Sequence, residues 1–410
     1  MAASSNWTVL VIPRASCALA AFLQLPSVPR VSVIITRARL FNALALVSVL
    51  ACGSCGGRPI QGALIPITTT AEGTSRVPIL VATTRQRVTT DTGEMFSGER
   101  AAEVSYAAIT VSIPPDAARK VGEVQWPASL PGDPGTNFVT VSAEYIDKQK
   151  FAASIAAMAK QTRRTKVLVF VHGFNNRFDE AVYRFAQIVH DSKVPVIPVL
   201  FTWPSRGEVR LRTYNYDRES ASYSRDALES LLGTLTSYPG ITEVNLLAHS
   251  MGNWVALEAL RGRSIRGGQT VASIRADKLK NAMLVAPDVD VDVFRAQIQR
   301  MGAARPRIAL FVSQDDSALR LSRTIADDAP RLGNIDPTQE PYRSELERDK
   351  ILVFDLTHMA TAGDDAHGRA FDDVTSVMGM IRKRLSEGQT LSDQGTDLGG
   401  QLENVSTLAR

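Results

Sequence analysis

From residue 166 onward, hydrophobic and polar positions alternate between two kinds of segment. Short apolar runs rich in β-branched residues lie at 166–171, 196–201, 244–248, 281–286, 308–312 and 351–356. Longer stretches with apolar residues at helical spacing separate or follow them, at 179–189, 218–235, 253–260, 291–300, 318–325 and 372–385. Strands that are apolar on both faces and separated by helices predict a largely parallel sheet covered by helices on both sides.

The pattern before residue 166 is less regular. Apolar runs at 77–82, 108–113 and 138–142 are separated by turns that contain Pro and Gly, and they predict three further strands. Residues 151–160 have helical spacing, whereas 327–350 form a long connection without clear periodicity, either a lid or a surface excursion. In such an α/β fold, functional residues are expected just beyond the carboxyl ends of the strands.

The two ends of the chain differ in composition from its centre. Residues 37–51 combine Arg-Ala-Arg with a short apolar run, which predicts that 1–51 are a leader with a secretory signal peptide. Residues 52–75 are rich in Gly, Pro, Thr and Ser and predict a flexible tether, and the polar residues 387–410 predict a disordered tail. The catalytic domain is therefore expected to span 76–386.

The leader ends in Val-Leu-Ala-Cys at 49–52, which resembles a bacterial lipobox. That resemblance implies that Cys52 becomes the acylated mature N-terminus and anchors an exported lipoprotein to the membrane, on the periplasmic side of the cell envelope. A plain signal peptide or an uncleaved anchor remains the alternative interpretation of the same residues.

Charge and cysteine usage narrow the function classes. The net charge of +4 arises from four arginines in residues 1–51, which contain no acid, so the remaining 42 basic residues balance the 42 acidic ones. The body of the chain therefore has no basic footprint for nucleic acid. All three cysteines, Cys17, Cys52 and Cys55, precede the predicted domain, which excludes an internal disulfide or a thiol nucleophile there.

The candidate nucleophile is Ser250, in Ala-His-Ser-Met-Gly at 248–252. An apolar strand pattern stops at the serine and a helical pattern begins after it, which predicts a sharp turn that exposes the hydroxyl. Such a turn requires small residues two positions before and after the serine, and these are Ala248 and Gly252. A helix N-cap serine after a buried strand is the structural alternative.

Candidate oxyanion donors come from two turns. The strand at 167–171 runs into His-Gly-Phe-Asn-Asn at 172–176, and we assign the donors to the backbone N–H groups of Phe174 and Met251. His172 is expected to hold this loop by side-chain hydrogen bonds. Candidate residues for the substrate pocket are Phe174, Asn175, Trp203 and His249, and the alternative for Phe174 and Trp203 is a place in the core.

Several acidic residues are candidates for the partner of the base. Asp316 follows the strand at 308–312, although it could simply cap the next helix, and the adjacent Asp315 is an alternative. Asp288 follows the preceding strand and is a third candidate. The alternating acids of 287–292 resemble a calcium loop superficially, but Val293 and Gln299 occupy the positions that need Gly and Glu, so no metal is expected. Asp288 or Asp290 is then expected to cap the following helix.

The sequence contains five histidines, and two of them follow the last strand. His358 lies almost directly after that strand, whereas His367 lies in a polar loop before the last helix. A loop of this kind can bring an imidazole over the serine, so His367 is the favoured base and His358 the alternative.

The order Ser250, Asp316, His367 is that of α/β hydrolases. Residues 77–385 resemble this superfamily and, within it, a bacterial lipoprotein-type family of uncharacterised esterase- or lipase-like hydrolases. The residues that carry the resemblance are Val-Ala-Thr-Thr-Arg at 81–85, Phe-Ser-Gly-Glu-Arg at 96–100, His-Gly-Phe-Asn at 172–175, Phe-Thr-Trp-Pro-Ser at 201–205, 248–252, Ala-Pro-Asp-Val-Asp at 286–290, Asp-Ser-Ala-Leu at 316–319 and Phe-Asp-Leu at 354–356. The resemblance implies that Asp316 and His367 are the partners of Ser250. The chain has Gly368-Arg369 where members tend to have Ser and an aromatic residue.

The leading functional hypothesis is a serine hydrolase that cleaves carboxylic esters of small molecules or lipids, without a cofactor. An acyltransferase with the same residues is an alternative, and a non-catalytic envelope scaffold is another, supported by Gly368-Arg369. Substrate identity, acyl-chain length and oligomeric state are left open by the sequence.

Overall fold

The computed structural model describes residues 61–90, 93–266, 277–326, 328–357, 359 and 367–372, all within the compact unit Ala51–Arg410. The predicted leader, the lipobox cysteine Cys52, the alternative base His358 and the predicted tail lie outside the described residues, as does the predicted last helix beyond residue 372. Among the described residues, no helix is long and apolar enough to cross a membrane.

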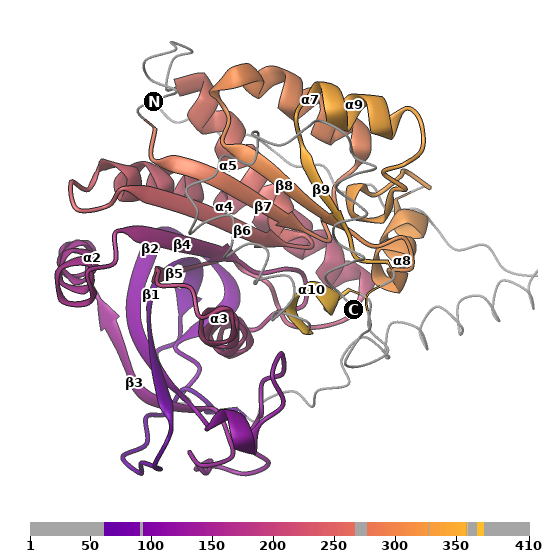
Figure 1. The fold of residues 1–410 in the computed structure, drawn as a ribbon. Helices are drawn as coiled ribbons and strands as arrows, with labels where there is room; N and C mark the ends of the chain where they lie inside the picture. Colours follow the sequence, from indigo (N-terminus) through magenta and orange to yellow (C-terminus); the bar gives the residue numbers. More distant parts are fainter. Residues whose placement is uncertain are drawn as a thin grey trace, which may run out of the picture. The chain divides into compact units, whose positions relative to one another are not determined.

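Nine strands in the described ranges form one sheet in the order β3-β2-β1-β5-β4-β6-β7-β8-β9 (Figure 1). Their bounds are β1 (Ser75–Arg87), β2 (Phe96–Ile113), β3 (Val139–Ile146), β4 (Lys166–Val171), β5 (Ile197–Thr202), β6 (Glu243–His249), β7 (Leu279–Val285), β8 (Arg307–Val312) and β9 (Leu352–Asp355). β2 pairs antiparallel with β1 and β3, and every other pairing is parallel.

Helices cover both faces of this sheet. The helices are α2 (Lys148–Thr162), α3 (Phe178–Ser192), α4 (Leu211–Ser237), α5 (Gly252–Arg266), α7 (Val291–Met301), α8 (Ser317–Ile325), α9 (Tyr342–Arg348) and α10 (Arg369–Asp372), with short 3-10 turns η1 (Asp116–Ala118), η2 (Gly302–Ala304) and η3 (Leu332–Asn334). Alternate β4 residues face two separate cores: Val169 packs with α2, α4, α5 and α7, and Phe170 packs with α3, α8 and α10. The predicted mostly parallel sheet with helices on both faces is confirmed.

The N-terminal part differs from the sequence prediction in two ways. β2 begins at Phe96, well before the predicted strand at 108–113. The sequence pattern did not reveal this first half of the strand, because it is only partly buried and lacks a continuous apolar run. Residues 61–67, placed in the predicted tether, pack onto the domain: Ala63 and Leu64 are buried, and the Ala63 carbonyl accepts a hydrogen bond from Tyr183. The packed domain therefore includes residues before 76.

The connection at 327–350 is also more ordered than its sequence pattern indicates. It contains η3 and α9, and it buries Leu332, Ile335 and Leu346. The N–H of Gly333 donates to the Pro287 carbonyl, and its own carbonyl accepts from the N–H of Ser313. This segment therefore links the loop after β7 to the loop after β8 through backbone hydrogen bonds. Its helix is too short for an apolar periodicity to be visible in the sequence.

Candidate active site

Ser250 lies at the apex of a sharp turn between β6 and α5. Its φ of 51° is left-handed, a conformation that costs a non-glycine residue energy and persists only where the surroundings hold it. The surroundings do so here, because its N–H donates to the Val285 carbonyl at 2.9 Å and its carbonyl accepts from the Asn253 side chain at 2.9 Å. The predicted strand, turn and helix are all present, and α5 points its N-terminus at the serine.

The small residues around Ser250 are required by close backbone contacts. A Cβ on Gly252 would lie 2.3 Å from the His172 carbonyl oxygen, and one on Gly173 would lie 2.9 Å from the Ser250 Cβ. The turn after β6 and the loop after β4 therefore touch through two glycines. This contact holds the loop at 172–176 beside the serine.

Replacing Gly252 with alanine should destabilise the protein, because the clash partner is a backbone carbonyl that cannot rotate away. Overpacking of this kind costs about 1–3 kcal/mol. We therefore expect a melting temperature lower by several degrees, at roughly 2–4 °C per kcal/mol. Gly240→Ala is the matched control, since nothing lies within 4 Å of its added Cβ. Equal melting temperatures for the two variants in thermal denaturation would contradict the close contact.

The structure brings Ser250, His367 and Asp316 into one hydrogen-bonded chain. His367 Nε2 lies 2.9 Å from Ser250 Oγ, and His367 Nδ1 lies 2.7 Å from Asp316 Oδ2. A carboxylate only accepts hydrogen bonds, so Nδ1 carries the imidazole proton and Nε2 accepts from the serine hydroxyl. Asp316 is fully buried, and its Oδ1 also accepts from the Leu319 N–H at 3.0 Å. It therefore caps α8 and orients His367 at the same time.

The other acids of the two loops have different surroundings. Asp290 caps α7 through the N–H groups of Asp292 and Val293. Asp315 accepts a hydrogen bond from the Ser313 hydroxyl at 2.6 Å. Asp288 is buried, accepts from the Tyr214 hydroxyl at 3.1 Å and lies 3.4 Å from Arg331 Nε. Asp316 is the carboxylate that the structure places at Nδ1 of His367.

The two predicted oxyanion donors flank the serine. Phe174 follows Gly173 in the loop that touches Ser250, and Met251 is the residue after the serine. In the part of the chain that the structure describes, neither backbone N–H has a hydrogen-bond acceptor. Phe174 is half-buried and meets the Tyr214 ring edge-on at 5.4 Å, and Asn175 beside it is half-buried with a left-handed φ of 60°.

His172 and Trp203 hold the backbone of the loop at 172–176 through hydrogen bonds with each other and with Gly173. The His172 Nδ1–H donates to the Gly173 carbonyl at 2.9 Å, while Nε2 accepts from the Trp203 N–H at 3.3 Å. Burial, together with the charge of Arg85, lowers the pKa of His172 to about 3, so the ring is neutral. Trp203 stacks on His172 and has no exposed surface. This burial favours the core alternative for Trp203, whose indole N–H donates to the His172 carbonyl at 2.9 Å.

His249 contacts the residue that carries the candidate base. Its Nε2–H donates to the His367 carbonyl at 3.2 Å, and its ring lies 4.9 Å from the rings of both His367 and Phe371. Burial lowers the pKa of His249 well below its ordinary value, so it adds no positive charge beside His367. The predicted pocket residue is half-buried, and these contacts hold the backbone of His367 in place.

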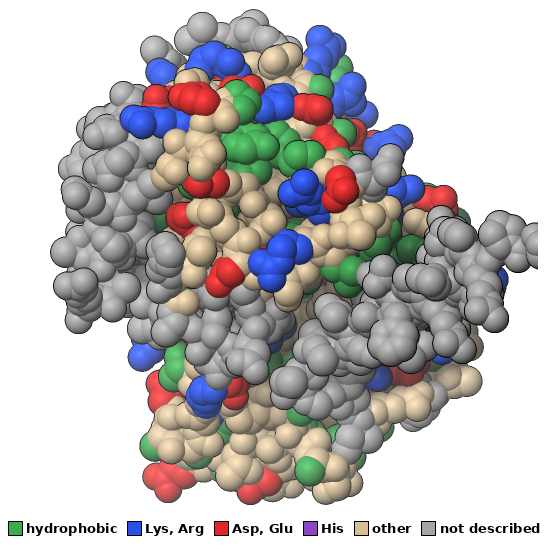
Figure 2. All heavy atoms as spheres, turned by 90° about the vertical axis from the view of Figure 1, so that its right-hand side faces the viewer, with side chains coloured by type: hydrophobic (Ala, Val, Ile, Leu, Met, Phe, Trp, Pro, Cys, Tyr) green, Lys and Arg blue, Asp and Glu red, His purple; other side chains and the backbone are tan. Residues whose placement is uncertain are grey.

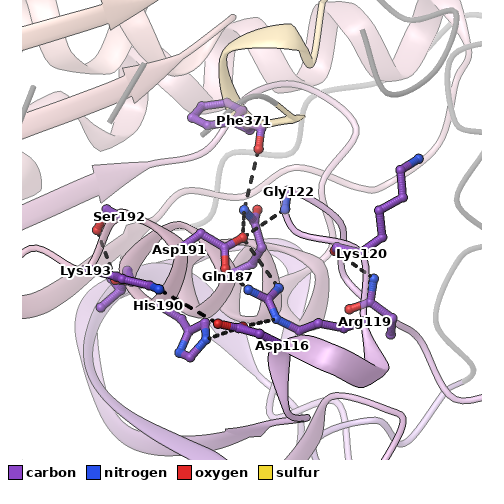
Figure 3. Close-up of polar contacts among 12 residues, drawn as sticks. Asp116, Arg119, Lys120, Gly122, Gln187, His190, Asp191, Ser192, Lys193 and Phe371 are labelled. Carbon is purple, nitrogen blue, oxygen red and sulfur yellow. Dashed lines mark hydrogen bonds and ion pairs between the residues drawn. The ribbon is translucent and has the colours of Figure 1, made fainter. Parts of the chain in front are cut away.

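A buried polar cluster anchors the α10 turn from the other side. Figure 3 shows Gln187 and Asp191, both on α3, between the Phe371 carbonyl and Arg119. The Gln187 amide donates to Asp191 at 2.8 Å and to Phe371 at 3.5 Å, and Asp191 pairs with Arg119 and accepts from the Gly122 N–H at 2.9 Å. The sequence analysis missed this cluster. Its signal was two polar residues, four positions apart, on the apolar side of a helix.

A separate cleft lies between α7, η3 and α9. Its lining is mostly apolar, from residues such as Phe294, Leu332 and Leu346, and does not include Ser250, His367 or Asp316. α7 and α9 lie at the top of the side of the molecule that faces the viewer in Figure 2, where hydrophobic side chains gather among charged ones. Among the described residues, no group of three or more His, Cys, Asp or Glu side chains could hold a metal ion.

The sheet order and the strand, turn and helix around Ser250 define an α/β hydrolase. Residues 147–384, more than half of the chain, match the family described as alpha/beta hydrolase of unknown function (DUF900), and the chain belongs to that family. No curated protein matches the chain.

Several solved structures resemble it at low identity. The putative cell surface hydrolase from Lactobacillus plantarum WCFS1 is 13% identical, with 60% of this chain and 97% of that chain covered and a TM-score of 0.32. The acylaminoacyl peptidase of Pyrococcus horikoshii is 9% identical, with 74% and 43% covered and a TM-score of 0.33. A lipase-esterase related protein from Clostridium acetobutylicum ATCC 824 is 11% identical, with 54% and 95% covered and a TM-score of 0.26.

Proposed function

We propose that the protein is a serine hydrolase that cleaves carboxylic esters through an acyl-enzyme intermediate. The observation that carries this proposal is the chain of short hydrogen bonds from Ser250 Oγ through His367 to Asp316. A hydroxyl is a weak nucleophile until an adjacent base accepts its proton, and a buried carboxylate keeps that base in the correct tautomer. The strained turn at Ser250 supports the same assignment, because strain of this kind is typical of catalytic positions.

The proposed reaction has two halves. Ser250 Oγ attacks the acyl carbon while its proton passes to His367 Nε2, and the N–H groups of Phe174 and Met251 stabilise the resulting oxyanion. The C–O bond to the alcohol breaks as His367 returns the proton to the leaving oxygen. Water then attacks the acyl-enzyme by the same route, and the carboxylic acid leaves with Ser250 restored. Asp316 accepts the hydrogen bond from His367 Nδ1 and stabilises the imidazolium.

Labelling with a fluorophosphonate probe tests the proposal directly. The probe reacts covalently with an activated serine, so we expect one label per chain, at Ser250, and hydrolysis of short p-nitrophenyl esters by the same preparation. Prior treatment with the probe should abolish the hydrolysis in proportion to the labelled fraction. A folded protein that neither reacts with the probe nor hydrolyses any ester of an acyl-chain-length series would contradict the proposal and favour a scaffold role.

A further inference from the structure

We propose that Arg85 is a positioning residue that fixes the oxyanion loop, defined as residues 172–176, so that the Phe174 N–H faces the oxyanion. The inference rests on the proposed ester hydrolysis and goes beyond it, because Arg85 does not contact the hydrogen-bonded chain of Ser250, His367 and Asp316. It assigns a role to a residue that is fully buried yet charged.

The Arg85 guanidinium holds both ends of the oxyanion loop. Its Nη2 donates to the Asn176 carbonyl at 2.7 Å and lies 3.2 Å from His172 Nε2, two residues on either side of Phe174. Its Nη1 donates to the Ser205 carbonyl at 2.8 Å and to the Ser97 carbonyl at 3.2 Å. A planar group with several fixed donors can hold several backbones at once, which a lysine ammonium cannot match in geometry.

These contacts join four sequence motifs that have no role in the proposed proton transfer. They are 81–85 on β1, 96–100 at the start of β2, the oxyanion loop after β4, and 201–205 at the end of β5. The pairing of β1 with β2 is irregular on both sides of Arg85, and the Arg85 N–H donates to Thr83 Oγ1 at 3.0 Å. Such irregularities re-aim a side chain. Here they accompany an arginine that points beneath the loop.

Two residues near Arg85, Ser205 and Asp217, accept hydrogen bonds from the backbone N–H groups that follow Phe174 in the oxyanion loop. The Asn176 N–H donates to Ser205 Oγ at 3.1 Å, and the Asn175 N–H donates to the buried carboxylate of Asp217. Ser205 Oγ in turn donates to Asp217 Oδ2 at 2.5 Å. Arg85 fixes the backbone of Ser205, so one interaction positions the acceptors for both residues after Phe174. The Phe174 N–H is left without an acceptor among the described residues.

Arg85 also places a positive charge behind the loop. Burial lowers its pKa to about 10, which leaves the guanidinium protonated at neutral pH, and Asp217 and Asp179 oppose this shift. The groups to which it hydrogen-bonds are neutral carbonyls and the neutral His172 ring. Because the nearby carboxylates of Asp217 and Asp179 offset part of this charge, the role of Arg85 rests on the backbones that its donors hold.

Kinetic comparison of Arg85→Gln, Arg85→Lys and the surface control Arg87→Gln tests this role. Losing one oxyanion donor typically lowers kcat by about 10²–10³-fold, and we expect a loss of this size for Arg85→Gln, with KM changed less than about threefold. The inhibition constant of a trifluoromethyl ketone, which forms a tetrahedral adduct with the serine, should rise by the same factor. Arg85→Lys should recover only part of the activity, and Arg87→Gln should match the parent.

Rates are expressed per active site titrated by exhaustive fluorophosphonate labelling, so that a fall in the folded fraction does not count as a fall in kcat. A folded Arg85→Gln variant within threefold of the parent in kcat would overturn the inference. If that variant does not fold, Arg85→Lys decides, because it keeps the charge but not the planar fork of donors that holds the Asn176 and Ser205 carbonyls; a tenfold loss of kcat supports the role and an unchanged kcat overturns it. A parent protein that is neither labelled nor active would refute the proposed function, and this inference with it.

Discussion

Ser250→Ala is expected to lower kcat for ester hydrolysis by about 10⁶-fold, the loss seen when the nucleophile of such a site is removed. The physical reason is that no other atom at the turn can form the acyl-enzyme bond. The fold should persist, because the backbone hydrogen bonds of residue 250 to Val285 and Asn253 do not involve the hydroxyl. The measurement is steady-state hydrolysis of p-nitrophenyl acetate, together with fluorophosphonate labelling.

Ser222→Ala on α4 is the matched control, because Ser222 is only half-buried and its hydroxyl makes one long hydrogen bond within the described residues, to the Arg218 carbonyl at 3.4 Å. It should leave kcat and labelling unchanged. A Ser250→Ala variant that retains more than a tenth of the parent activity would show that the nucleophile is another group.

Asp316→Asn is expected to lower kcat by about 10⁴-fold while leaving stability nearly unchanged. Asparagine caps a helix as well as aspartate does, so the hydrogen bond to the Leu319 N–H is retained. An amide at Nδ1, however, no longer holds the imidazole in the required tautomer or stabilises its positive charge, which accounts for a loss of this size. Kinetics and thermal denaturation of the same preparation separate the two effects.

Two further variants sharpen this comparison. Asp290→Asn makes the same chemical change at the N-cap of α7, away from His367, and should leave kcat unchanged. Asp316→Ala removes the cap as well and should cost about 1 kcal/mol of stability in addition to the lost activity. Equal activities for Asp316→Asn and Asp290→Asn would show that Asp316 only caps its helix.

Much of the fold could be predicted because the central strands are apolar on both faces. β4 has the predicted bounds, and β5, β6 and β8 differ by one residue at one or both ends. The candidate nucleophile was visible because the turn requires small residues at fixed spacing. Asp315 and Asp316 could not be separated in the sequence, since neighbouring side chains differ only in direction, and that direction is set by the α8 cap.

The features that the sequence concealed depend on tertiary contacts. Arg85 ends an apolar run and therefore resembles a solvent-facing strand end, yet its partners come from three distant segments. Trp203 resembles a pocket residue because it follows a strand end, and only its contacts with His172 in the loop after β4 explain its burial. Gln187 and Asp191 look like polar interruptions of an amphipathic helix, and only the position of Phe371 explains their burial.

Gly173 and Gly252 form the close contact between the loop after β4 and the turn after β6, two neighbouring strands in the middle of the sheet. On one side, the segments after β6, β8 and β9 carry the groups that would exchange protons and one oxyanion donor, the Met251 N–H. On the other, contacts from β1, β2 and β5 hold the loop that carries the second donor, the Phe174 N–H. These two groups of residues meet where β4 and β6 end side by side. A small displacement of the loop after β4 relative to the turn after β6 would move the Phe174 N–H away from Ser250, while the Met251 N–H stayed beside it. The fit between these two glycines is therefore expected to matter for the rate of the reaction as much as the three side chains of the hydrogen-bonded chain do.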